Sequence, residues 1–296
     1  MQITAVILFD LFLFWFLPFY ATWVYGSFVV ACVVAVPIIT TISIWYMQYW
    51  KPQNSRWIRD NPKLTSLLYD TPLEVHGPGK DFDPRDAIHR DSKFVVGAHP
   101  HGLYPIGITL YFTLNMKFWT FHTCVHWMLT TFPFLKEISG WAGCIDATRE
   151  VMKDFIERPG VQGLVVCPGS IREGVIEKPG TVIKRTGFIS LAIQHKAHLI
   201  PAYDATTASM WDIWLPMGTY FHERLRYPWP VFAKGRKPAY LSPLPKYKTV
   251  HLYLGKPIKT ANREMGTVLD EFYHALESLK EEARKDGHLT CDAEWK

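Results

Sequence analysis

The feature that most constrains this chain is an apolar stretch at its amino terminus. Between residues 3 and 49 the only charged side chain is Asp10, and Phe, Leu, Val, Ile and Trp dominate. About 20 apolar residues span a bilayer as a helix, so this stretch is long enough to cross twice. We predict a transmembrane helical hairpin within residues 1–50, built from helices near 3–19 and 22–44, with a re-entrant hairpin as the alternative.

Basic residues follow this stretch directly. Lys51, Arg56, Arg59 and Lys63 come within the next segment. Under the positive-inside rule they place the rest of the chain on the cytosolic side. A cleaved signal peptide fits poorly, because no Lys or Arg precedes the apolar stretch and the stretch is too long. We therefore expect the hairpin to remain as an anchor.

Charge and cysteine content narrow the class of protein. Residues 224–259 hold nine Lys or Arg and no Asp or Glu, which suits lipid headgroups or the phosphates of a bound molecule. A solvated basic loop is the alternative, and nucleic acid is disfavoured because no binding motif accompanies the charge. The five cysteines are widely spaced and form no Cys-x-x-Cys pair, so neither a disulfide framework nor a metal site is predicted.

Beyond the hairpin we divide the chain into a connector at 51–92 and a folded domain at 93–296. The connector is rich in Pro, Gly and charge, as linking segments are. In the domain, buried-strand patterns alternate with helical ones, which favours an α/β fold with a largely parallel or mixed sheet. The expected strands are 94–98, 162–167, 198–203 and 250–254, and the expected helices are 147–157, 186–196 and 262–285.

The first strand runs directly into His99-Pro100-His101-Gly102. Imidazole can accept a proton from a hydroxyl at cytosolic pH, since its pKa is close to neutrality. Pro100 fixes the backbone and Gly102 permits a close approach, so the turn can hold two imidazoles at a strand end. Such a turn suits acyl transfer to an alcohol, although two histidines around a proline are more often structural.

The second strand also ends in a turn, Pro168-Gly169-Ser170-Ile171-Arg172-Glu173-Gly174. Ligands of open α/β sheets bind at the carboxyl ends of strands, where two such turns can converge. Glu173 could orient an imidazole, and Arg172 could meet a phosphate of coenzyme A. The alternative for this pair is a salt bridge at the start of the next helix.

With these blocks in view, the sequence resembles the diacylglycerol acyltransferase 2 family, which includes monoacylglycerol acyltransferases and some wax-ester synthases. Residues 94–102 are similar to the family's strand and His-Pro-His-Gly signature. Residues 164–173, 184–203 and 243–258 follow in the family's order, as its glutamate turn, its Arg-Lys-Gly-Phe helix with the next strand, and its closing Gly-x-Pro-Ile strand. The resemblance covers about 93–259.

The resemblance implies a glycerolipid-acyltransferase-like mixed sheet with flanking helices, preceded by the transmembrane hairpin. It also implies an acyl-CoA-dependent acyltransferase that makes neutral lipid, most simply triacylglycerol from diacylglycerol, with monoacylglycerol or a long-chain alcohol as alternative acceptors. Acyl-CoA would be a co-substrate and no cofactor is implied. The expected partners are acyl-CoA, the acceptor and the lipid bilayer, and a homodimer stays open. The expected location is the endoplasmic reticulum membrane, facing the cytosol, or lipid droplets.

The site residues carried over by the resemblance fall into two groups. The catalytic group is His99, His101 and Glu173, with one histidine deprotonating the acceptor and no covalent acyl-enzyme. Its position directly after the strand favours His99 as the base. The substrate-binding group is Pro100, Gly102, Gly169, Ser170, Arg172, Arg185, Gly187 and Phe188.

The chain departs from the family pattern in three places. Its usual Gly-Gly-Ala is Pro168-Gly169-Ser170, with the glutamate displaced by Arg172, and Asp204-Ala-Thr-Thr-Ala stands where Gly-Glu-Asn is expected. Broader glycerolipid acyltransferases carry an aspartate five residues after the histidine, whereas Tyr104 and Ile106 occupy those positions here. Glu173 is the candidate substitute for that aspartate.

The alternatives to an acyltransferase are a metal-binding protein, a serine hydrolase and a lipid-binding protein. His122 and His126 lie four residues apart on an expected helix, a spacing that can bind a metal, although packing is the more common role. A serine hydrolase is disfavoured because no Gly-x-Ser-x-Gly elbow is present. A non-catalytic membrane lipid-binding protein on the same fold is the alternative from another class.

Overall fold

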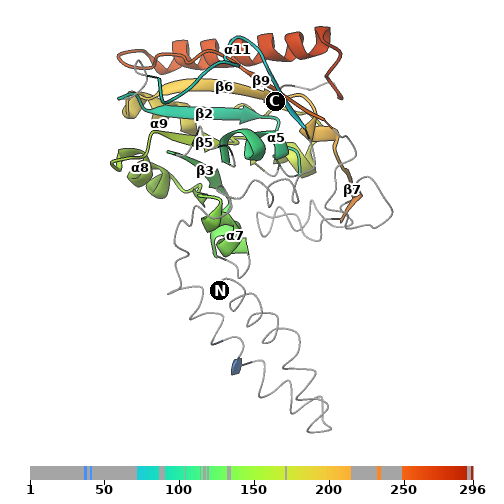
Figure 1. The fold of residues 1–296 in the computed structure, drawn as a ribbon, viewed down its shortest axis with the longest axis horizontal. Coiled ribbons are helices and arrows are strands. Elements are labelled where there is room, and N and C mark those ends of the chain that lie inside the picture. The colour runs from blue at the N-terminus through green and yellow to red at the C-terminus, as the bar shows by residue number, and fades with distance from the viewer. Residues whose placement is uncertain are drawn as a thin grey trace.

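The structure of this chain, a computed structural model, is drawn in Figure 1. It describes residues 72–86, 91–103, 105–113, 115, 118, 120–131, 135–170, 172–214, 232–234, 249–291 and 295, together with 37, 38 and 41. The hairpin predicted for residues 1–50 and most of the predicted connector therefore lie outside the described residues. Within the described ranges, each helix is too short or too polar to serve as a bilayer span.

A seven-stranded mixed sheet, in the order β1-β9-β6-β2-β5-β3-β4, forms the centre of the fold (Figure 1). Its strands are β1 (Leu73–His76), β2 (Phe94–His99), β3 (Phe121–Val125), β4 (Ile145–Asp146), β5 (Gly163–Val166), β6 (His198–Asp204) and β9 (Val250–Leu254). The strands from β6 to β4 in this order are parallel. β9 is antiparallel to β6, and β1 is parallel to β9. A two-stranded sheet of β7 (Asp212–Trp214) and β8 (Phe232–Lys234) stands apart.

Helices connect the strands. The described α-helices are α5 (Ile106–Ile108), α6 (Trp127–Thr131), α7 (Leu135–Trp141), α8 (Arg149–Glu157), α9 (Gly187–Gln194) and α11 (Met265–Lys285). Two π-helical segments, η3 (Thr109–Thr113) and η5 (Arg172–Ile176), and one 3-10 segment, η6 (Thr207–Ser209), complete them. The mixed α/β sheet with flanking helices that the sequence predicted is confirmed. Its four expected strands correspond to β2, β5, β6 and β9, and its three expected helices to α8, α9 and α11.

The sheet begins earlier in the chain than the sequence indicated. β1 lies inside the segment 51–92 that we assigned to a connector, and it pairs with β9 from Leu73↔Val250 to His76↔Tyr253. Four residues between Pro72 and Gly77 are too few to give a clear alternating pattern, so the strand was not recognised. Its partner β9 lies far along the chain, and only the tertiary fold brings the two together.

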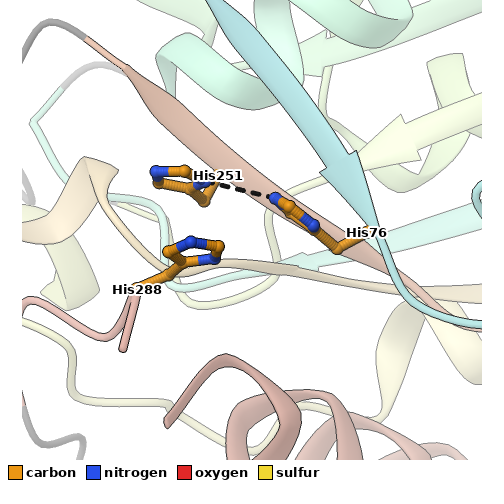
Figure 2. A group of neighbouring side chains, drawn as sticks. All are labelled: His76, His251 and His288. Carbon is orange, nitrogen blue, oxygen red and sulfur yellow. Dashed lines mark hydrogen bonds between the residues drawn. The ribbon is translucent and has the colours of Figure 1, made fainter. Parts of the chain in front are cut away.

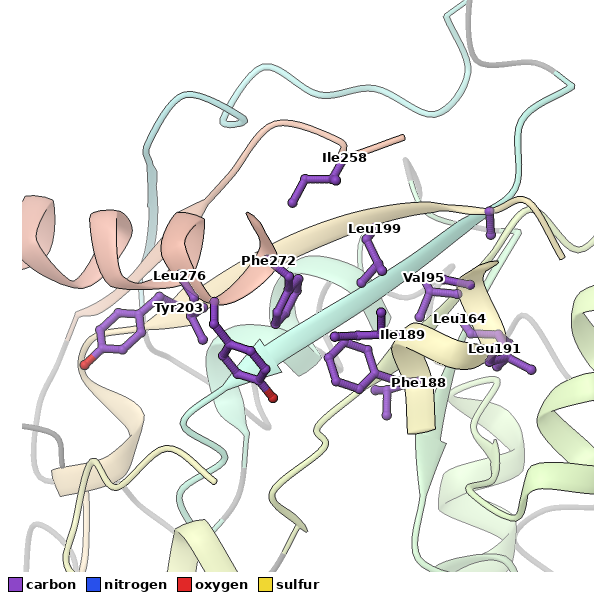
Figure 3. Packing of buried hydrophobic residues seen from close by; sticks show 14 of the residues in the cluster. Val95, Leu164, Phe188, Ile189, Leu191, Leu199, Tyr203, Ile258, Phe272 and Leu276 are labelled. Carbon is purple, nitrogen blue, oxygen red and sulfur yellow. The ribbon is translucent and has the colours of Figure 1, made fainter. Parts of the chain in front are cut away.

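The core has two layers, one on each face of the sheet. On one face, Phe188 and Ile189 of α9 and Phe272 and Leu276 of α11 pack over the strands, as Figure 3 shows. On the other face, an aromatic cluster of buried rings covers the strands, and it comprises Phe82, Phe94, Tyr111, Phe112, Phe118 and Phe121. Because strand side chains alternate between faces, Val95 points to the helices while Phe94 and Val96 point to the aromatic cluster. His99 therefore lies on the helix face.

The prediction that His122 and His126 share a helix face was wrong. His122 belongs to β3, and its Nδ1 lies 2.9 Å from the carbonyl oxygen of Gly143. His126 directly follows β3, and in an extended chain that rises about 3.3 Å per residue four residues span roughly 13 Å. One ion cannot bind both imidazoles at that separation.

Candidate active site

His99 and Glu173 form a buried pair at the carboxyl end of β2. Both side chains have 0% exposure, and Nδ1 of His99 lies 2.6 Å from Oε1 of Glu173. An ionised carboxylate can only accept hydrogen bonds, so Nδ1 carries the proton and Nε2 bears the lone pair. Nε2 is also buried and has no hydrogen-bond partner within the described part of the chain. The pair thus presents an imidazole nitrogen that can accept a proton.

Glu173 is fixed by backbone donors on both of its oxygens. The amide of Ile183 donates to Oε1 at 2.7 Å, and the amide of His101 donates to Oε2 at 3.2 Å. Glu173 lies on η5, which follows β5, and β5 pairs in parallel with β2. Parallel neighbours end at the same edge of the sheet, so the two strand-end turns meet there, about 70 residues apart in sequence.

Gly169 is the residue that makes room for the carboxyl group. A Cβ atom at Gly169 would lie 1.8 Å from Cδ of Glu173 and 2.0 Å from its Oε1. Gly169→Ala is therefore expected to displace Glu173 from His99 and to lower the rate of the reaction about 100-fold, as loss of a positioned catalytic group does. The measurement is the initial rate per folded molecule.

The matched control for Gly169→Ala is Gly266→Ala. Gly266 lies in α11, and a Cβ there would meet nothing within 4 Å. Alanine is favoured over glycine in a helix by about 1 kcal/mol, so the control should keep its rate and its stability. An unchanged rate in Gly169→Ala would contradict the role given to Glu173.

His101 is placed differently from His99. It is half-buried, and its Nδ1 lies 2.6 Å from the carbonyl oxygen of Gly102, so Nδ1–H is the donor. Burial lowers the pKa of His101 below its ordinary value. Gly102, with φ of +65°, packs against Thr207, and Pro100 is buried. The turn therefore holds the two imidazoles in separate environments, and of the two rings only that of His99 contacts Glu173.

The remaining predicted substrate-binding residues are spread over the same edge of the sheet. Arg172 forms an ion pair with Glu177 at 2.9 Å, across η5, where the sequence offered a salt bridge at the start of the next helix as the structural alternative. Ser170 and Arg185 are exposed, and Gly187 opens α9 with free space around it. Phe188 is 3% exposed, and its ring packs against that of Phe272, with the two ring centroids 5.1 Å apart. Phe188 thus belongs to the core beneath His99, because Gly97 of β2 leaves room for that ring.

Asp204 is a buried carboxyl that the sequence did not single out for a role. It accepts hydrogen bonds from the amides of Thr206 and Thr207 and from the hydroxyl of Thr207, at 3.2, 2.9 and 2.5 Å. Burial raises the pKa of Asp204 above its ordinary value, against the lowering effect of these bonds. Thr207 also contacts Gly102. Asp204 therefore holds Thr207, and through it the end of β6, in place beside the histidine turn. An Asp followed by two threonines is a turn signal that could have found it.

Comparison with known proteins bears on the identity of this site. The family model of diacylglycerol acyltransferases matches residues 78–284, well over half of the chain, including both turns. Human 2-acylglycerol O-acyltransferase 3 is 25% identical over 54% of this chain and 50% of its own length. Mouse acyl-CoA wax alcohol acyltransferase 1 is 24% identical over 64% of this chain and 59% of its own length. Rat diacylglycerol O-acyltransferase 2 is 26% identical over 37% of this chain and 31% of its own length. The chain thus spans about half the length of the curated relatives it matches.

Among solved structures, the 1-acyl-sn-glycerophosphate (LPA) acyltransferase PlsC from Thermotoga maritima aligns over 95% of this chain and 98% of its own, with a TM-score of 0.41 and 16% identity. The family assignment rests on the sequence match, which begins two residues after β1, runs into α11 and contains His99 and Glu173. The chain therefore belongs to the diacylglycerol acyltransferase family.

Proposed function

We propose that the protein is an acyl-CoA-dependent O-acyltransferase that makes neutral lipid, with diacylglycerol as the first candidate acceptor. The observation that carries the proposal is the buried His99–Glu173 pair, whose Nε2 lacks a partner within the described residues. The relatives support it, since their names specify acyl transfer to 2-acylglycerol, wax alcohol and diacylglycerol. Monoacylglycerol and long-chain alcohols are therefore the alternative acceptors.

The chemistry assigned to His99 is general-base catalysis. Nε2 takes the proton of the acceptor hydroxyl as its oxygen attacks the thioester carbonyl of acyl-CoA. The carbon–sulfur bond then breaks, and the departing thiolate of coenzyme A receives the proton from the imidazolium. The ester and free coenzyme A are the products, and no acyl group is held on the protein. Glu173 accepts from Nδ1–H throughout and stabilises the positive charge on the imidazolium.

The proposal includes a membrane setting. The acceptor and the product are water-insoluble, and the apolar residues 3–49 offer an anchor that would keep the catalytic domain at the cytosolic surface of the endoplasmic reticulum or of a lipid droplet. Exposed Arg185 and the neighbouring Lys184 supply positive charge near the site for the phosphates of coenzyme A. Arg172 is available for that role only if it leaves Glu177. A homodimer also belongs to the proposal, and the mass of the purified protein in solution tests it.

Acyl transfer from labelled acyl-CoA tests the function. Membranes that carry the full chain are offered diacylglycerol, monoacylglycerol and a long-chain alcohol in parallel, and His99→Ala/His101→Ala membranes serve as the control. We expect a labelled neutral lipid from at least one acceptor, at a rate that falls at least about 100-fold in the double variant. The acceptor that gives product identifies the substrate.

The second candidate is a lipid-binding protein without acyl transfer. The replacement of Gly-Gly-Ala by Pro168-Gly169-Ser170 and the ion pair of Arg172 with Glu177 favour it, because both alter the turn beside the histidines. Absence of labelled product from all three acceptors, with acyl-CoA binding retained, would support this reading over catalysis.

A further inference from the structure

Three histidines gather on the helix face of the sheet, at the edge away from β4. His76 ends β1, His251 lies on β9, and His288 follows α11. One nitrogen from each ring lies within 4.8 Å of a nitrogen of the other two. Figure 2 shows the rings of His251 and His288 stacked, with centroids 3.7 Å apart, and a ring nitrogen of His76 facing His251. Each ring is only partly exposed.

Two of the rings already have the spacing of metal ligands. Nε2 of His76 and Nδ1 of His251 lie 3.1 Å apart. Two nitrogens bound to zinc at 2.0–2.1 Å in a tetrahedral site stand about 3.3 Å apart. An oxygen of Glu74 lies 3.8 Å from Nε2 of His76 and 3.5 Å from Nδ1 of His251. These three atoms therefore form one face of a tetrahedron.

The third ring is oriented by a chain of hydrogen bonds. The hydroxyl of Tyr253 donates to Oδ2 of Asp286 at 2.8 Å and lies 2.6 Å from Nδ1 of His288. A phenol has a single proton, so the hydroxyl must accept from Nδ1–H of His288. This assigns the proton to Nδ1 and leaves the lone pair on Nε2 for a ligand. A histidine that binds a metal usually donates its other ring N–H to a second group that fixes its tautomer, and the Tyr253 hydroxyl is such an acceptor here.

The charge around the three rings also suits a cation. The carboxyl groups of Glu74, Asp286 and Glu282 surround His76 and exert an attractive electrostatic effect on positive charge there.

We propose that His76, His251 and His288, with the carboxylate of Glu74, bind a zinc ion that joins the edge of the sheet to the segment after α11. Three imidazoles and one carboxylate match the nitrogen and oxygen ligands that Zn²⁺ takes in proteins. The site is separate from the catalytic pair. His76, Tyr253, Tyr203 and His99 occupy one row across neighbouring strands, so about 14 Å of sheet lies between His76 and His99.

The ion would act as a structural crosslink. β1 is a four-residue strand at the edge of the described sheet, where it pairs with β9, and His288 lies outside the helix. Ligands at residues 74, 76, 251 and 288 would close a long loop of the chain. Crosslinks that close long loops lower the entropy of the unfolded state more than those that close short ones. Zinc is therefore expected to raise the melting temperature of the protein.

The test uses the full chain purified in detergent, stripped with a chelator and titrated with Zn²⁺. We expect one tightly bound ion per chain and a higher melting temperature in its presence. His251→Ala and His288→Ala should each weaken binding by at least about 100-fold, and Tyr253→Phe by about 10-fold, as loss of a supporting group does. His274→Ala is the matched control, because His274 is exposed on α11 and should bind as the wild type does.

The outcomes separate the crosslink from adventitious binding. Cooperative melting of each variant verifies its fold, and His288→Ala decides the question if His251→Ala fails to fold, since His288 lies outside every strand and helix. Equal affinities of the wild type and of His288→Ala for Zn²⁺ would overturn the proposal. In that case the His76–His251 contact is a hydrogen bond between imidazoles.

Discussion

His99→Gln is expected to lower the rate of acyl transfer about 1,000-fold while the protein remains folded. A general base contributes about 10²–10⁴-fold to such reactions, and a glutamine amide cannot accept the proton of the acceptor. Glutamine is the preferred substitution because its amide N–H can still donate to Glu173. Alanine would remove one of the three hydrogen bonds that this buried carboxylate accepts, at a cost of about 1.5–3 kcal/mol in stability. The measurement is the initial rate with saturating acyl-CoA, compared at equal amounts of folded protein.

His101→Gln supplies the comparison for the same experiment. His101 donates to the carbonyl oxygen of Gly102 and touches Glu173 only through its backbone amide. Its side chain therefore lacks the contact that orients His99, and a smaller loss of rate is expected. If His101→Gln lost more activity than His99→Gln, the base would be His101 and the role given to the buried pair would be wrong.

Glu173→Gln is expected to lower kcat about 100- to 1,000-fold with little change in KM for either substrate. Oε1 of Glu173 receives hydrogen bonds from His99 and Ile183, and Oε2 receives one from His101. A glutamine amide has one accepting oxygen, so its NH₂ group must face a donor on one side. If NH₂ faces His99, the imidazole changes tautomer and Nε2 carries the proton, which removes the base.

The separate effects of Glu173→Gln on kcat and on KM show whether Glu173 positions His99 or only stabilises the fold. Glu173 is fully buried and acts through His99, so it should affect the reacting complex more than substrate binding. Glu173→Asp keeps the charge on a shorter side chain and should recover part of the rate. A uniform loss of folded protein with unaltered kcat per molecule would show instead that Glu173 only holds the two turns together.

Much of the sheet could be predicted because its central strands are buried on both faces. β2, β5 and β6 are short, apolar runs that end in turn residues, and each was recognised within one or two residues. β3 was missed, since Phe121–Val125 contains His122 and Thr123 and follows an aromatic-rich stretch with no strand boundary. β1 was missed because its four residues gain their conformation from pairing with β9.

The sequence by itself determined the family, four of the seven strands of the sheet, three of the flanking helices, and the two turns that carry His99 and Glu173. These follow from local patterns: apolar runs, glycines and prolines at strand ends, and an imidazole next to a strand. The spacing between the two turns could not show which histidine meets the glutamate. That contact depends on parallel pairing of β2 with β5 and on the missing Cβ of Gly169.

The tertiary structure alone decided which distant groups became neighbours. His76, His251 and His288 have no common motif, because β1, β9 and the segment after α11 are joined only by sheet pairing and by helix packing. A sequence records which side chains can donate, accept or ligate, while the distances on which those interactions depend are fixed by long-range packing.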